Sequence, residues 1–150
     1  MIHNKLRSSF AAICCSAALI GGLAACGGDD SSTSSGGSTI KVDGEQWDGD
    51  FTTSCTESGD SLILAITETS NDAGRGAGAT LTKADNSVQV VAIGDAATQG
   101  GLAYNSASPD SKPKVEKDGQ TYTITGEATA LDMTNPTDPK KSSFELVFSC

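Results

Sequence analysis

Alternation of apolar and polar residues at every second position is the feature that most constrains this fold. It is clearest over residues 121–131, where threonine and glutamate separate apolar or small side chains. The residues at these alternate positions are Tyr122, Ile124, Gly126, Ala128 and Ala130. A period of two places successive side chains on opposite faces of a β-strand. Since no segment after residue 26 sustains the spacing of three and four that marks a helix, the sequence predicts an all-β domain.

Further short runs of this kind are separated by Gly, Asn and Asp. The expected strands are 39–42, 51–55, 61–67, 79–82, 88–93, 101–104, 114–117 and 143–149. The turn residues 117–120 predict a hairpin that joins 114–117 to 121–131. Short strands at regular spacing predict an antiparallel β-sandwich or a partly open barrel.

Two other stretches are expected to connect strands. Residues 74–78 are rich in glycine but lack the glycine spacing and the following helix of a dinucleotide-binding loop, so they predict a loop between strands. Residues 132–141 contain two prolines and predict a long turn.

The first residues have the layout of a secretory signal. Lys5 and Arg7 precede an apolar run over 10–25, which is shorter than the roughly 20 residues that span a bilayer. Leu23-Ala24-Ala25-Cys26 resembles a bacterial lipobox, in which the cysteine thiol is acylated before cleavage. We therefore expect a signal peptide at 1–25, a lipidated Cys26 followed by a flexible Ser/Thr/Gly tether to residue 39, and one domain over 40–150.

The cysteines separate into groups once cleavage before Cys26 is assumed. Cys14 and Cys15 are removed with the signal and Cys26 carries lipid, which leaves Cys55 and Cys150. Outside the cytosol an even pair of thiols is normally oxidised, so the sequence predicts a disulfide between these two residues.

Charge and composition argue against several function classes. After cleavage nineteen acidic residues stand against eight basic ones, a net charge of −11, which disfavours a nucleic-acid partner. The one histidine is His3, in the signal, so the usual catalytic base and zinc ligand is missing. We expect no enzyme activity, no cofactor and no metal.

One carboxylate cluster could in principle hold a calcium ion. It surrounds Trp47 and consists of Asp43, Glu45, Asp48 and Asp50. Its spacing does not match an EF-hand loop, and an acidic turn at the start of a strand is commonly only solvated.

Several segments together carry a family resemblance. They are 42–44, 54–56, 62–66, 117–119, 122–126, 130–136 and 143–146, followed by Cys150. With them the chain resembles the mycobacterial nineteen-kilodalton lipoprotein antigen family, the LpqH-like lipoproteins. The most specific piece is Asp132-Met133-x-Asn135-Pro136.

The resemblance implies a surface-displayed lipoprotein of the cell envelope, anchored outside the cell membrane by two or three acyl chains, palmitate among them, on Cys26. It implies that host Toll-like receptors sense the lipid, and that the tether is an O-glycosylated glycoprotein segment. The candidate acceptors are Ser31, Ser32, Thr33, Ser34, Ser35, Ser38 and Thr39.

The resemblance does not assign an activity to the folded domain. The leading hypothesis is non-enzymatic display or interaction. The alternative is a carrier of an envelope lipid or glycolipid, since the small residues Gly126, Ala128 and Ala130 on an inward face would leave a cavity.

Overall fold

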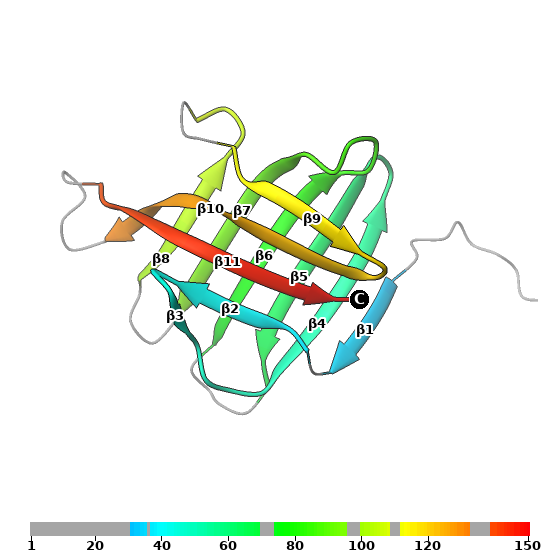
Figure 1. Ribbon diagram of the computed structural model, residues 1–150, viewed down its shortest axis with the longest axis horizontal. Helices are drawn as coiled ribbons and strands as arrows, with labels where there is room; N and C mark the ends of the chain where they lie inside the picture. Colours follow the sequence, from blue (N-terminus) through cyan, green and yellow to red (C-terminus); the bar gives the residue numbers. More distant parts are fainter. Residues whose placement is uncertain (1–30, 36, 70–73, 96–99, 109–111, 133–138) are drawn as a thin grey trace, which may run out of the picture.

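The protein is an antiparallel β-sheet that curls into a half-barrel (Figure 1). The computed structural model describes residues 31–35, 37–69, 74–95, 100–108, 112–132 and 139–150. Its strands are β1 Ser31–Ser35, β2 Thr39–Val42, β3 Glu45–Gln46, β4 Phe51–Ser58, β5 Ser61–Glu68, β6 Arg75–Thr82, β7 Val88–Asp95, β8 Gly100–Asn105, β9 Lys114–Asp118, β10 Thr121–Asp132 and β11 Lys141–Ser149. None of these residues belongs to a helix long and apolar enough to cross a membrane.

The strand order explains the curl. Neighbours follow one another as β1-β4-β5-β6-β7-β8-β10-β11-β2-β3, with β9 beside β10, and every pair is antiparallel. One end of β10 pairs with β8 and the other with β9, so this strand turns away from the direction of β4–β8. In Figure 1 β10, β11 and β2 therefore cross over β4–β8. The expected partly open barrel is confirmed, as a single curled sheet.

The core lies between these two crossing parts of the sheet. Burial alternates along β4, β5 and β6, as a strand with one covered face requires. The largest fully buried side chains come from both parts and include Leu64, Ile66, Leu81, Ile124, Leu146 and Phe148. Their burial is the main source of stability for such a sheet.

The inward face of β10 is filled rather than hollow. Tyr122, Ile124 and Ala128 are buried, as the alternation predicts. A Cβ placed on Gly126 would lie 3.0 Å from Pro113 Cβ and 3.2 Å from Phe144 Cζ, so these two rings occupy the space above the glycine. The small residues that motivated the carrier hypothesis do not leave a cavity at Gly126.

The prediction of a loop over 74–78 is wrong. Strand β6 begins at Arg75 and is bonded on both sides, to β5 and to β7. Ala77 and Ala79 face the core, and a Cβ at Gly76 would lie 2.6 Å from the carbonyl oxygen of Ile66. Glycine is needed here because the neighbouring backbone comes so close.

The boundary of the expected tether also differs. Residues 1–30 lie outside the described residues, but β1 pairs with β4 in the register Ser31↔Thr56. Ser38 is buried; its hydroxyl bonds the Thr53 hydroxyl and accepts a hydrogen bond from Ser149 N at 3.1 Å. Serines can join the sheet because edge pairing satisfies backbone groups without needing apolar side chains.

The predicted disulfide is confirmed. Cys55 on β4 is bonded to Cys150, 95 residues later, with the two Cα atoms 5.8 Å apart. Cys55 is buried and Cys150 packs against the core. The bond joins the two crossing parts of the sheet.

We expect the double variant Cys55→Ala/Cys150→Ala to lose about 4–5 kcal/mol of unfolding free energy, because a cross-link that closes a loop of this length strongly restricts the unfolded chain. Urea unfolding followed by circular dichroism measures the loss. Wild-type protein unfolded in reducing agent should match the variant. A midpoint equal to that of oxidised wild type would contradict the prediction.

Candidate ligand-binding site

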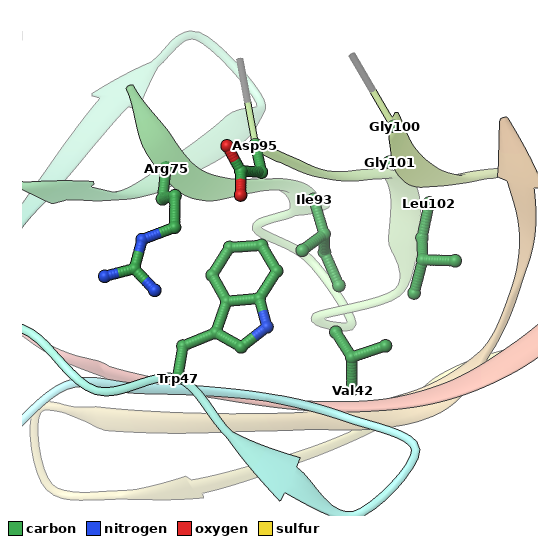
Figure 2. A pocket seen from close by; sticks show the side chains of 8 residues that line it. All are labelled: Val42, Trp47, Arg75, Ile93, Asp95, Gly100, Gly101 and Leu102. Carbon is green, nitrogen blue, oxygen red and sulfur yellow. The ribbon is translucent and has the colours of Figure 1, made fainter. Parts of the chain in front are cut away.

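A pocket of about 250 Å³ lies where one end of the curled sheet meets the β2–β3 hairpin. Figure 2 shows Trp47 projecting from beyond β3 towards the ends of β6, β7 and β8. The pocket is lined by Val42, Trp47, Arg75, Ile93, Asp95, Gly100, Gly101 and Leu102. Its walls are mostly apolar, with one cationic and one anionic side chain.

The hairpin that carries Trp47 is fixed by its turn. Asp43 and Gly44 have φ of 51° and 82°, the left-handed pair that a two-residue hairpin turn requires. Trp47 N then donates to the carbonyl oxygen of Ile40 at 2.9 Å. The indole ring is thereby directed towards the end of the sheet.

Asp43 also ties this hairpin to β11. Its amide donates to Ser143 O at 2.9 Å, and its Oδ1 accepts from Ser143 N at 2.8 Å. Hydrogen bonds from Ser142 and Ser143 lower the pKa of Asp43, because they favour the charged carboxylate. The carboxylate is therefore used to hold the hairpin in place.

The other members of the predicted carboxylate cluster do not converge. Glu45, Asp48 and Asp50 are exposed, and the backbone carbonyl oxygens of Asp48 and Asp50 accept hydrogen bonds from Arg75 and Thr69. Among the described residues no three acidic, cysteine or histidine side chains gather as a metal site would need.

A buried ion pair supports one wall of the pocket. Glu68 at the end of β5 has a side chain with no exposed surface, and Arg75 at the start of β6 is 22% exposed. Arg75 Nε donates to Glu68 Oε2 at 2.8 Å, and Nη2 donates to Glu68 Oε1. A buried carboxylate needs such a two-point partner, since an unpaired charge away from water is strongly unfavourable.

Arg75 links this pair to the hairpin. Its Nη2 also donates to Asp48 O at 2.6 Å, and its guanidinium lies 5.8 Å from the centre of the Trp47 ring. The hydrogen bond to Glu68, together with the charges of Glu68, Asp95 and Asp48, raises the pKa of Arg75. One side chain thus positions both the indole and the backbone beside it.

From the sequence, Trp47 was named only as the centre of the carboxylate cluster, and Glu68, Arg75 and Asp95 were not identified. All three stand at inward positions of the alternation, in phase with the buried Ile66, Ala77 and Ile93. One signal in the sequence could have identified these residues. It is the presence of charged residues that continue the apolar face at the ends of three successive strands.

A second hollow, of about 580 Å³, lies beside β4. It is lined by Gly37, Ser38, Gly49, Asp50, Phe51, Thr52 and Thr69. One aromatic side chain among polar groups and glycines gives it little apolar wall, so it is the weaker candidate for a ligand site.

The structure describes the candidate glycosylation residues but not the candidate lipidation residue. Cys26 lies outside the described residues. Among the candidate glycosylation sites, Ser31, Ser32, Thr33, Ser34 and Ser35 form β1. Thr33 is exposed, Thr39 is half-buried in β2, and the buried hydroxyl of Ser38 is not available in the folded domain.

These features define a disulfide-tied β half-barrel that offers a small, mostly apolar pocket. A family model described as Mycobacterium 19 kDa lipoprotein antigen matches residues 31–150. The chain belongs to this family of mycobacterial lipoprotein antigens, as its sequence segments predicted. The family's name is that of an antigen and not of an enzyme.

The chain is also similar to curated lipoproteins. Lipoprotein LpqH of Mycobacterium avium is 32% identical over 112 residues, which cover 74% of this chain and 66% of that protein. Lipoprotein LpqH of Mycobacterium tuberculosis (strain ATCC 25618 / H37Rv) is 32% identical over 112 residues, with 74% and 67% covered. The chain spans about two thirds of the length of these relatives.

We expect Arg75→Ala to lower the free energy of unfolding at pH 7, because the buried Glu68 carboxylate would lose the two charged hydrogen bonds from Arg75. The loss should shrink in acid, where Glu68 accepts a proton and the buried charge disappears. The emission of Trp47, the only tryptophan, should shift to the red as its ring becomes more exposed. Urea unfolding at several pH values and fluorescence spectra measure these effects.

Lys83→Ala is the matched control, since it breaks a half-exposed ion pair with Glu57 away from the pocket and should change stability little. The double variant Arg75→Ala/Glu68→Gln should recover part of the lost stability. An Arg75→Ala loss that is the same at all pH values would contradict the assignment.

Proposed function

We propose that this protein is a non-enzymatic lipoprotein of the cell envelope, held on the outer side of the membrane by acyl chains on Cys26, and that its β domain serves display and interaction. Membership of a lipoprotein antigen family supports the anchor, as does the Leu23-Ala24-Ala25-Cys26 motif after an apolar run. In the same proposal the acyl chains, rather than the β domain, are what a host Toll-like receptor senses.

The start of β1 supports a domain held near the membrane. Ser31 follows Cys26 by five residues, and five extended residues reach at most about 18 Å. Because Ser31 pairs with Thr56, this short link meets the sheet near the β4–β5 turn. The anchored end of the sheet is then the end that carries Gly59 and Asp60.

The pocket lies at the opposite end. Arg75 begins β6 and Asp95 ends β7, whereas the β6–β7 turn beyond Thr82 bonds to the β4–β5 turn through Lys83 N and Asp60 O at 2.8 Å. Figure 1 shows β1 and the β8 end of the sheet on opposite sides. In an anchored protein the pocket faces away from the membrane.

Replacing Cys26 by Ala should release the protein from the membrane, because the acylated thiol is the proposed anchor. Cell fractionation followed by immunoblotting measures the shift to the soluble or secreted fraction. Cys14→Ala, within the expected signal, should leave the membrane pool unchanged. A Cys26→Ala protein that stays in the membrane fraction would exclude this anchor.

The orientation can be tested with the single tryptophan. In vesicles whose lipid headgroups carry dansyl, energy transfer from Trp47 should be weak, because the pocket points away from the bilayer. A variant with Trp47→Phe and Asp60→Trp moves the donor to the expected anchored end and should transfer more. Equal transfer from the two positions would contradict the orientation while leaving the anchor itself intact.

A further inference from the structure

The pocket is divided into an apolar wall and a polar edge. Figure 2 shows the indole of Trp47 beside Ile93 and Val42, with Arg75 on the opposite side of the ring and Asp95 above the ring, between Arg75 and Ile93. Leu102 completes the apolar wall. Gly100 and Gly101 add no side chain, so their part of the wall is backbone. A ligand here would have one apolar side and one hydrogen-bonding side.

Its volume limits the ligand to one small group. Pockets for drug-sized molecules hold roughly 300–1,000 Å³, and this one holds about 250 Å³. A single sugar-sized ring fits a pocket of this volume, whereas a long acyl chain needs a deeper and uniformly apolar channel.

The charged groups around the pocket disfavour an anionic ligand. Among the described residues of the lining, Arg75 is the one cationic side chain, and Glu68 accepts two hydrogen bonds from it. Asp95 adds a negative charge, and the chain as a whole has a net charge of −9. Phosphate and carboxylate groups would therefore be repelled.

The ligand should also be uncharged. A cation would find Asp95, but it would also meet the guanidinium that already lies 5.8 Å from the centre of the Trp47 ring. Like charges at such a short distance disfavour binding. A neutral ligand avoids both conflicts.

The polar edge offers acceptors and donors together. Asp95 accepts hydrogen bonds through its carboxylate, and Arg75 donates through its guanidinium. The indole N–H is a further donor, and Figure 2 shows it on the side of the ring that faces Val42. Hydroxyl groups match such an edge because each can both donate and accept.

The site is held in shape before any ligand arrives. The Arg75–Glu68 pair, the bond from Arg75 to Asp48 O and the bond from Trp47 N to Ile40 O fix the ring and the edge. A preformed site loses little conformational entropy on binding, so a small ligand that makes few contacts can still bind.

We propose that this pocket binds one ring of a neutral saccharide, with the C–H face of the sugar against Trp47 and its hydroxyls bonded to Asp95. The binding does not depend on Cys26. It makes this a glycan-binding domain whose site lies at the end of the sheet distal to β1.

The emission of Trp47 reports directly on this pocket, since the chain has one tryptophan. Purified protein is titrated with the methyl glycosides of glucose, galactose, mannose and arabinose, and in parallel with sodium octanoate and butylammonium chloride. We expect saturable binding of at least one glycoside. Asp95→Asn should weaken that binding roughly tenfold, the effect of losing one charged hydrogen bond.

Asp118→Asn is the matched control, because it removes the same charge from an exposed position outside the pocket lining and should leave the titration unchanged. The proposal is overturned if none of the glycosides changes the emission, if Asp95→Asn and Asp118→Asn bind alike, or if octanoate or butylammonium saturates the pocket instead. Membrane fractionation of Cys26→Ala is a separate readout, so failure of the anchor and failure of glycan binding are told apart.

Discussion

The length of β10 is the constraint on which the half-barrel depends. This strand pairs with β8 at one end, with β9 at the other and with β11 along its opposite edge. A shorter strand would extend the sheet without turning it across itself. Because β10 turns, the apolar faces of β4–β8 and of β10 and β11 cover one another, and hydrophobic burial then holds the sheet curled. The disulfide and the pocket both exist only because these faces meet.

Much of this fold was predictable from the period-two pattern. The strands near 39–42 and 143–149 follow their alternation closely, and the pair of cysteines was identified by elimination. The errors occurred where side chains carry no such signal. Gly76 belongs to a strand because the backbone of Ile66 needs the space, and Ser31 to Ser35 join β4 through backbone groups alone. Composition cannot report either interaction.

The pocket was less predictable than the fold. In the sequence Trp47 stands among acidic residues that could hold a cation, although their spacing does not match an EF-hand loop. In the structure these carboxylates do not form a cation site, because Asp43 is hydrogen-bonded to β11. The charged side chains that support or line the pocket are Glu68, Arg75 and Asp95. Strand register brings the ends of β5, β6 and β7 together. A linear sequence shows the inward phase of each charge, but it does not show which charges meet.

The pairing of β2 with β11 has a consequence for the order of folding. Ile40 on β2 lies opposite Leu146 on β11. One edge of β2, an early strand, is therefore covered only after β11, the last strand, has been made. Contacts so distant in sequence slow folding, since a long loop must close before they form. As the chain is synthesised from its N-terminus, the edge of β2 stays open to other strands until residues 144–147 exist. The chain therefore needs protection from intermolecular strand pairing during this interval.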